Sequence, residues 1–258
     1  MTTVSLPRLH WGEPSAPRRA LLVHGLGSSA ATMWFLAEGL AAAGWSATAV
    51  DLRGHENAPR ASRYRIEDFA ADVRATRADH GNAWDLVLGH SIGAAAATQA
   101  AGTVDDSTRG AWTRRLVLLD PALALDTAAR QAILEAQLAN FDGATVEGIA
   151  AQFPHWHPLD VEFRVRAVTS ASRFALERAV LDNEDWDVTA SVPHVSAPTL
   201  IIAADPEHGS LFAGDHAAAV LAANPLFEQV VLPGAGHSVH RDQPAETLQR
   251  ILAWLNAP

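Results

Sequence analysis

One serine of the chain lies in a setting that suits a nucleophile. Gly89–Gly93 (Gly-His-Ser-Ile-Gly) follows an apolar run and opens an alanine-rich segment, so Ser91 lies between two glycines at an expected strand-to-helix turn. Such a G-x-S-x-G turn holds a serine hydroxyl clear of the sheet, ready to attack an acyl group. The alternative is an ordinary helix-capping serine, because serine is a preferred N-cap residue. Covalent acyl transfer is therefore the first hypothesis for Ser91.

A nucleophilic serine needs a general base, a carboxylate that orients the base, and donors for the oxyanion. Of the 12 histidines, His237 is the candidate base, because it follows the last apolar run on the glycine-rich loop Pro233–His240. Glycines allow such a loop to bring an imidazole close to Ser91. His240 is the nearest alternative, but we expect it to enter the last helix.

Two backbone N–H groups are needed for the oxyanion, and one belongs to Ile92, which follows the nucleophile. Its position at a helix start, where partial positive charge gathers, suits an anion. The second donor is expected on His24–Gly27 (His-Gly-Leu-Gly), which follows an early apolar run. Leu26 is the predicted donor, because the glycines let the backbone approach the substrate closely. His24 is interpreted as a brace for this loop.

These residues depend on a sheet that brings their loops together. Short apolar runs alternate with longer segments rich in Ala and Leu, which predicts a mostly parallel sheet flanked by helices. The predicted strands are Ala20–Val23, Ala47–Val50, Leu86–Leu88, Leu116–Leu119, Leu200–Ile202 and Gln229–Leu232, with Val4–Trp11 as an antiparallel edge strand. The predicted core helices are Ala30–Ala43, Ile66–Asp79, Ile92–Gly102 and Asp215–Ala223.

Residues 121–188 interrupt this alternation, because they contain no strand-like run. Thr127–Asn140 is predicted to be a helix, with shorter helical pieces around Phe141–Ala151 and Arg164–Leu181. We therefore predict a helical lid at 121–188, inserted into a core made of 1–120 and 189–258. A lid over a site needs an apolar underside, and the predicted substrate-binding residues are Phe153, His155, Trp156 and Phe174.

Metal and thiol chemistry receive little support from the sequence. The chain has no cysteine, which excludes disulfides, thiolate nucleophiles and zinc–thiolate sites. His155 and His157 would share one face of a strand and could bind a metal, but the sequence places no third ligand near them. We therefore predict no metal site and favour contact with substrate.

Composition and charge narrow the classes of function. At 258 residues, with 48% hydrophobic and 19% charged residues, the chain suits one α/β domain with an insertion. The formal net charge of −10 argues against nucleic acid or an anionic membrane surface as a partner, since both would repel the protein. No apolar run approaches about 18 residues, and Met1–Trp11 lacks the apolar stretch of a signal peptide, so we expect a cytoplasmic protein. The oligomeric state stays open.

Six segments together resemble the α/β-hydrolase fold superfamily, of the lid-bearing esterase, lactonase and C–C hydrolase type. In chain order they are His24–Gly27, Asp51–His55, Gly89–Gly93, Leu118–Pro121, Pro198–Ile202 and Gly234–His237. The resemblance implies an α/β-hydrolase fold with a helical lid inserted after the sixth strand. It also implies acyl transfer to water through an acyl-serine, with no metal or organic cofactor. Asp51 and Arg53 would brace loops.

The acid that orients the base is left open between three residues. In most of the family it follows the strand after the lid, usually as Asp in a Gly-x-x-Asp turn. Here Ala204 replaces the glycine, Glu207 holds the usual Asp position, and Asp205 lies two residues earlier. In a minority of the family the acid follows the strand before the lid, where this chain has Asp120. Asp120 is preferred, with Asp205 and Glu207 as alternatives, because all follow strands whose ends share the carboxyl edge of the sheet.

The leading hypothesis is a serine hydrolase that cleaves a carboxylic ester or a lactone. The acidic composition and the aromatic lid favour a small to medium, apolar and neutral substrate. A C–C bond hydrolase of the same fold would use the same triad on another electrophile. From a different class, a hydrolase-fold ligand-binding protein would keep the pocket without turnover. A dehalogenase is disfavoured, because it needs a carboxylate where Ser91 lies.

Overall fold

A computed structural model describes residues 2–78, 83–103 and 112–257 of the chain. At its centre lies a seven-stranded sheet with the order β1-β3-β2-β4-β5-β6-β7. Neighbouring strands are parallel, except that β1 pairs antiparallel with β3. The predicted sheet and its edge strand are confirmed. The strands are β1 (Arg8–Trp11), β2 (Arg18–Val23), β3 (Trp45–Val50), β4 (Leu86–His90), β5 (Leu116–Leu119), β6 (Thr199–Ala203) and β7 (Phe227–Val231).

The central strands are apolar on both faces, and this fixes them inside the molecule. Every residue of β4, β5 and β6 is buried. Successive side chains of a strand point to opposite faces, so Leu116 and Leu118 join one hydrophobic cluster while Val117 and Leu119 join the other. Burying such a side chain contributes about 1.5–3 kcal/mol. The sheet therefore separates two cores.

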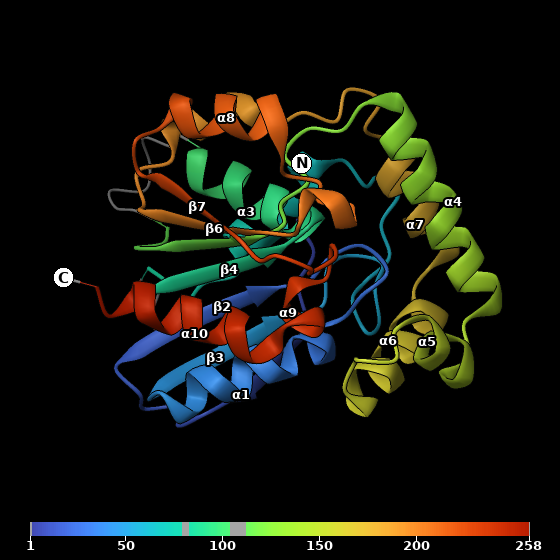
Figure 1. The fold of residues 1–258 in the computed structure, drawn as a ribbon, viewed down its shortest axis with the longest axis horizontal. Helices are drawn as coiled ribbons and strands as arrows, with labels where there is room; N and C mark the ends of the chain where they lie inside the picture. The colour runs from blue at the N-terminus through green and yellow to red at the C-terminus, as the bar shows by residue number, and fades with distance from the viewer. Residues whose placement is uncertain (1, 79–82, 104–111, 258) are drawn as a thin grey trace.

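Helices cover both faces of the sheet. Figure 1 shows α1 and α10 on one face and α3 and α8 on the other. The predicted helix 66–79 ends at Ala75, and its last position, Asp79, lies outside the described residues. The helical segments of the core are the 3-10 turns η1 (Ala30–Met33), η3 (Thr189–His194) and η4 (Pro206–His208), and the helices α1 (Trp34–Ala42), α2 (Ile66–Ala75), α3 (Ile92–Gly102), α8 (Gly214–Ala223), α9 (Val239–Asp242) and α10 (Pro244–Leu255).

Alanine dominates α3, the helix that begins directly after Ser91. Ala94–Ala97 and Ala100 are all buried. Their methyl groups let the helix lie close to the sheet and to its neighbours. At its end the approach is closer still, since a Cβ at Gly102 would lie 2.4 Å from the carbonyl oxygen of Ser191. Small residues therefore set the position of α3.

Four consecutive helices lie between β5 and β6: α4 (Thr127–Gly143), α5 (Val146–Gln152), α6 (Pro158–Ser170) and α7 (Arg173–Leu181). We call them the helical insert; Figure 1 shows them beside the core. The expectation of an insertion after the sixth strand is wrong, because the insert follows the fifth, β5. Residues 2–7 form no strand, so a single edge strand precedes the parallel ones. Within the described ranges, no helix is long and apolar enough to cross a membrane.

Candidate active site

Ser91 is the single residue between a strand and a helix. β4 ends at His90 and α3 begins at Ile92, and Ser91 has φ 54° and ψ −120°. A positive φ is strained for a residue with a side chain, and such strain gathers at functional sites. The Ser91 hydroxyl makes no helix-capping hydrogen bond. The geometry therefore favours the nucleophile turn over the capping alternative.

Three glycines allow this turn to form. A Cβ at Gly89 would lie 2.6 Å from the carbonyl oxygen of Gly93, and a Cβ at Gly93 would lie 2.4 Å from that of His24. Across the turn, a Cβ at Gly25 would lie 2.7 Å from His90 Nδ1 and 3.2 Å from Ser91 Cβ. A side chain at any of the three positions would therefore clash with its neighbours. The loop after β2 consequently touches the turn that carries Ser91.

The parallel strands bring Ser91 and Asp120 to one edge of the sheet. Each is the first residue after its strand, β4 or β5. The Ser91 N–H donates to the carbonyl of Leu119 at 3.1 Å, and the Asp120 N–H donates to that of Ile202 at 2.8 Å. Asp120 also has a positive φ of 35°. The carboxyl edge of a parallel sheet is where ligands bind in open α/β folds.

Asp120 holds His237 by a direct hydrogen bond. His237 Nδ1 donates to Asp120 Oδ2 at 2.6 Å, and the Asp120 side chain is 0% exposed. Asp120 accepts three further bonds, from Leu211 N–H at 3.0 Å, Ala204 N–H at 3.1 Å and the Ser210 hydroxyl at 2.6 Å. Burial raises the pKa of Asp120, but the hydrogen bond and charge of His237, with the other donors, outweigh burial and hold the pKa below its usual value.

The two alternative acids have other partners. Asp205 accepts from Glu207 N–H at 2.9 Å and from Gly234 N–H at 2.7 Å. These two hydrogen bonds lower the pKa of Asp205. The bond from Gly234 also tethers the loop that carries His237 to Asp205. Glu207 is exposed. Of the three candidates, Asp120 is the one whose contact with the imidazole the structure records.

Two buried histidines tie the loop after β2 to the loop after β3. Each Nδ1 donates to a carbonyl of its own loop. His24 Nε2 accepts from Leu52 N–H at 3.0 Å, and His55 Nε2 accepts from Gly27 N–H at 3.0 Å. Burial lowers the pKa of His24 to about 4 and that of His55 to about 3, so both rings are neutral. The interpretation of His24 as a brace agrees with these bonds, and the predicted donor Leu26 lies within the braced loop.

Asp51 and Arg53 also hold loops together, as the resemblance implied. Asp51 accepts from Ala30 N–H at 2.8 Å. Arg53 forms a buried ion pair with Asp72 at 2.6 Å. Both side chains thus act within the scaffold.

The sequence interpretation missed the role of His90. His90 Nε2 donates to the backbone carbonyl of His237 at 3.0 Å. The centroid of its ring lies 4.7 Å from that of His237 and 4.7 Å from that of His240. Burial and the neighbouring His240 lower the pKa of His90 well below its usual value. His90 is therefore a neutral ring that anchors the His237 loop; its place beside Ser91 was the only available signal.

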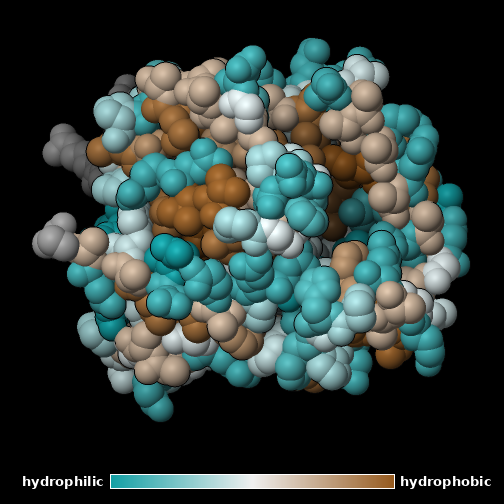
Figure 2. All heavy atoms as spheres, viewed as in Figure 1, coloured by the Kyte–Doolittle hydropathy of each residue, from teal (hydrophilic) through white to brown (hydrophobic). Residues whose placement is uncertain are grey.

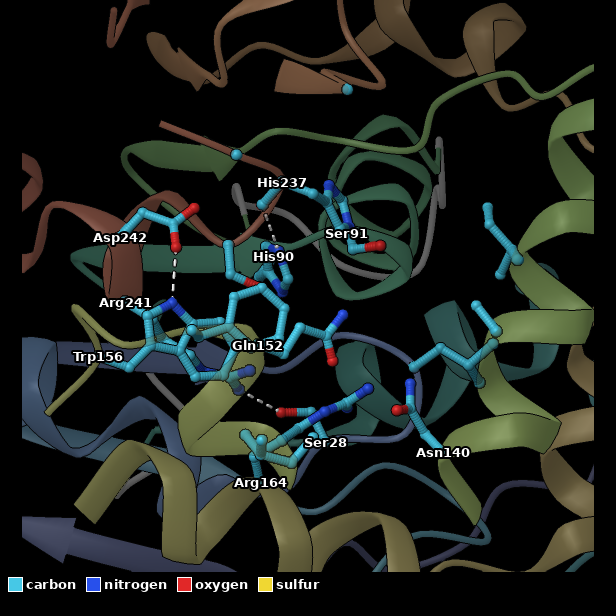
Figure 3. A pocket seen from close by; sticks show the side chains of 18 of the residues that line it. Ser28, His90, Ser91, Asn140, Gln152, Trp156, Arg164, His237, Arg241 and Asp242 are labelled. Atoms are coloured by element: carbon cyan, nitrogen blue, oxygen red, sulfur yellow. Dashed lines mark hydrogen bonds between the residues drawn. The ribbon is translucent and has the colours of Figure 1, made fainter. Parts of the chain in front are cut away.

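A cavity of about 420 Å³ opens beside Ser91 and His237. Figure 2 shows a hollow between the core and the helical insert, with hydrophobic side chains on its walls. Figure 3 shows Ser91, His90 and His237 together on one side of the cavity, Asn140 and Arg164 on the other, and Gln152 between them. The insert lines the cavity with Ile133, Ala136, Gln137, Asn140, Ile149, Gln152, Phe153, Trp156 and Arg164.

The four predicted substrate-binding residues divide into two pairs. Phe153 and Trp156 line the cavity, stacked at 4.0 Å, and Trp156 Nε1 donates to Asp242 at 2.6 Å. His155 and Phe174 do not line it within the described part of the chain, which corrects the prediction for both. His155 is half-exposed and hydrogen-bonds to Asp242, while Phe174 is 50% exposed and packs edge-on against a core tyrosine.

The two histidines considered as metal ligands have separate partners. His155 bonds to Asp242, and His157 Nδ1 accepts from Leu159 N–H at the start of α6. Across residues 2–78, 83–103 and 112–257, no group of three or more His, Cys, Asp or Glu side chains is arranged to hold a metal ion.

Two arginines that no sequence motif predicted line the cavity, Arg164 and Arg241. Arg164 Nη1 donates to the carbonyl of Gly27 at 2.5 Å, and Arg241 Nη2 donates to Ser28 Oγ at 2.8 Å. The Arg241 guanidinium also lies 5.1 Å from the Trp156 ring. Only the structure reveals that Arg164 of α6 and Arg241 of α9 both reach the loop after β2.

The family follows from this fold and from the sequence together. Residues 20–250 match the model of the alpha/beta hydrolase family. This match spans most of the chain, so the chain belongs to the alpha/beta hydrolase family. The matched region contains the Ser91 turn, Asp120 and the His237 loop.

Individual proteins resemble the chain to different extents. Lipase LipV of Mycobacterium tuberculosis is 33% identical over 129 residues, which are 50% of this chain and 47% of that lipase, about half of its length. The solved structure of E-2-(acetamidomethylene)succinate hydrolase has a TM-score of 0.81 at 23% identity, covering 98% of this chain and 96% of its own. An esterase from Exiguobacterium antarcticum has a TM-score of 0.78 at 15% identity, covering 100% of both chains. The two structures share the fold of this chain.

Proposed function

We propose that the chain is a serine hydrolase that cleaves a carboxylic ester through an acyl-serine intermediate. The observation that carries this proposal is the 2.6 Å hydrogen bond from His237 to the buried Asp120. It lies at the sheet edge where the strained Ser91 opens onto the same cavity as His237. The partial match to a lipase supports ester cleavage. A lactone, as a cyclic ester, would undergo the same steps.

The proposed reaction begins when Ser91 Oγ attacks the carbonyl carbon while His237 Nε2 takes the hydroxyl proton. The ester C–O bond then breaks, His237 gives the proton to the departing alcohol, and the acyl group remains on Ser91. Water attacks the acyl carbon as His237 removes its proton, the acid leaves, and Ser91 Oγ recovers a proton. Asp120 stays ionised, keeps a proton on Nδ1 and stabilises the imidazolium.

The N–H groups of Leu26 and Ile92 are the proposed oxyanion hole. Ile92 is the first residue of α3, where N–H groups have no partner within the helix. Leu26 lies between Gly25, which approaches Ser91, and Gly27, which His55 holds. Donors aimed at the developing negative charge supply much of the rate enhancement in such reactions.

The helical insert is proposed to act as a lid, with residues 121–188 as one part and residues 1–120 and 189–258 as the hydrolase core. Ile133, Ile149 and Phe153 give the lid an apolar inner surface. A small or medium ester can bury its apolar part there, and the enclosure limits access of bulk water. The proposed partner is accordingly a small molecule.

A fluorophosphonate probe and p-nitrophenyl butyrate test this proposal. We expect the wild type to be labelled and to release nitrophenol, and Ser91→Ala to lose both. Ser62→Ala, an exposed serine outside the cavity, is the matched control and should behave as wild type. Absence of labelling in the wild type would favour a ligand-binding protein, whereas labelling with no ester turnover would favour the C–C hydrolase alternative.

A further inference from the structure

The cavity wall carries two positive charges, although the protein has a net charge of −10. Arg164 comes from α6 of the insert and Arg241 from α9 of the core, and both line the cavity beside Ser91. Figure 3 shows Arg164 and Ser28 next to each other and Arg241 beside Trp156. A neutral, apolar ligand would give these guanidinium groups nothing to bind.

Arg241 has nearby partners for its charge, although its buried Nε has no hydrogen-bond partner among the described residues. It is 3% exposed, donates to Ser28, and packs over the Trp156 ring. Burial lowers the pKa of Arg241, and the charges of Asp160 and Asp242 oppose that effect. Those two carboxylates thus offset its charge from a distance, which leaves Arg164 as the group to explain.

Arg164 has a backbone partner and no nearby counter-charge. Its recorded hydrogen bond goes to the carbonyl of Gly27. In the described ranges, no carboxylate oxygen lies within 4.0 Å of either cavity guanidinium. Burial and the neighbouring Arg241 lower the pKa of Arg164 to about 9, so it remains charged at neutral pH. Arg164 is half-buried, and a guanidinium that is partly removed from water without a counter-ion is unfavourable.

The geometry of a guanidinium group suggests which anion would pair with Arg164. The planar fork of Arg matches a carboxylate with two parallel N–H···O bonds. Asn140 and Gln152 line the same cavity and add amide N–H donors. The apolar surface of Ile133 and Phe153 suits the carbon chain between an ester and an acid group.

We propose that the substrate is an ester that carries a free carboxylate, and that Arg164 binds this carboxylate while Ser91 attacks the ester carbonyl. The inference rests on the proposed function and deepens it. It replaces the neutral substrate expected from composition, because the overall charge of a protein does not describe the field inside one cavity. The carboxylate lies in the acyl part or in the alcohol part of the ester.

Paired esters of equal length separate these possibilities. Monomethyl glutarate carries its charge in the acyl part, with methyl hexanoate as the neutral partner; 4-acetoxybutanoate carries it in the alcohol part, with pentyl acetate as the neutral partner. We expect wild-type kcat/KM to favour one charged ester over its partner by about 10- to 100-fold, as charge-assisted hydrogen bonds provide. Acid release in a pH-stat is the measurement.

Substitutions at Arg164 test the assignment. Arg164→Gln should lower kcat/KM for the preferred charged ester about 10- to 100-fold and leave its neutral partner within about 3-fold; Arg164→Lys should lie between. Arg166→Gln, on the same helix but exposed and paired with Glu56, is the matched control and should keep the preference. Equal losses on charged and neutral esters would show that Arg164 merely latches the insert to Gly27, and would overturn the proposal.

A binding measurement keeps the two proposals separable. Glutarate should bind the Ser91→Ala protein, and adding Arg164→Gln should weaken that binding at least about 10-fold in calorimetry. If no ester is hydrolysed but glutarate binds through Arg164, the hydrolase proposal fails and the carboxylate site stands. If esters are hydrolysed without preference and glutarate does not bind, the carboxylate site fails alone.

Discussion

Replacing Asp120 by asparagine should lower kcat/KM for p-nitrophenyl acetate by about 10⁴-fold, or about 5.5 kcal/mol of transition-state stabilisation. The change keeps the size of the side chain and removes its charge. The carboxylate is fully buried, and its Oδ2 receives the proton-bearing Nδ1 of His237 at 2.6 Å. Without that charge, the imidazolium formed during attack by Ser91 loses its partner in a water-poor setting.

The magnitude follows from the donors around Asp120. Oδ2 accepts from His237 and Leu211, and Oδ1 accepts from Ala204 and Ser210. An asparagine NH₂ at the first position forces the His237 proton onto Nε2, the nitrogen that must act as base. At either position the NH₂ faces a backbone N–H, which leaves a buried donor unsatisfied and lowers the free energy of unfolding by about 1–3 kcal/mol. Activity should therefore fall far more than stability.

Steady-state kinetics, together with urea unfolding, measure both effects on the same variants. Asp205→Asn and Glu207→Gln serve as matched controls and should stay within about 10-fold of wild type, because Asp205 bonds to the backbone of Glu207 and Gly234 and pairs with the exposed His208, and Glu207 is exposed. A folded Asp120→Asn protein that keeps more than about a tenth of its activity would refute the reasoning. So would an Asp205→Asn protein that loses more than Asp120→Asn does.

Two further predictions concern the scaffold around Ser91. Gly93→Ala should lower the free energy of unfolding by at least about 1–3 kcal/mol and depress turnover, because its Cβ would lie 2.4 Å from the His24 carbonyl oxygen. Gly143→Ala is the control, because nothing in the described ranges lies within reach of its Cβ, and it should be neutral or stabilising in urea unfolding. As the pH falls from about 6.5 to 5, the unfolded chain protonates histidines that stay neutral in the fold, with pKa values of about 4 for His24 and about 3 for His55. Protonation of each of the two histidines in the unfolded chain should then lower the free energy of unfolding by roughly 1.5 kcal/mol. Urea unfolding at both pH values measures this, and a free energy of unfolding that does not fall over the interval would contradict the account.

The sheet and the nucleophile turn could be predicted from the sequence because their signals are local. Each apolar run became a strand within a few residues, and Leu116–Leu119 agrees with β5 at both ends. The glycines around Ser91 mark a turn that few other residues could form. Position along the chain alone singled out His237 as the candidate base, since the loop that follows the last parallel strand starts at the same sheet edge.

The sequence ranked three candidate acids without deciding between them, and it did not separate the lid residues that line the cavity from those that do not, because their environment is built by distant segments. Asp120 and Asp205 both follow strands at one edge, and what separates them is that His237 bonds to Asp120, whereas Asp205 accepts from Glu207 N–H and Gly234 N–H. Trp156 and Phe174 are both aromatic residues of the insert, and the sequence does not distinguish them. In the structure Trp156 lines the cavity, whereas Phe174 is half-exposed to solvent. No sequence pattern marked Arg164, because its proposed role follows from the absence, among the described residues, of a carboxylate near its guanidinium, which only the structure shows.

The alanines of α3 have a thermodynamic consequence for the helix that supports the nucleophile. An alanine side chain has no rotamers to lose, so Ala94–Ala97 give up no side-chain conformational entropy on packing. A platform of leucines or methionines could relax into other rotamers when the acyl group arrives and when it leaves. This one has no such alternatives, so in the proposed reaction α3 would give Ser91 the same support before and after each acyl transfer.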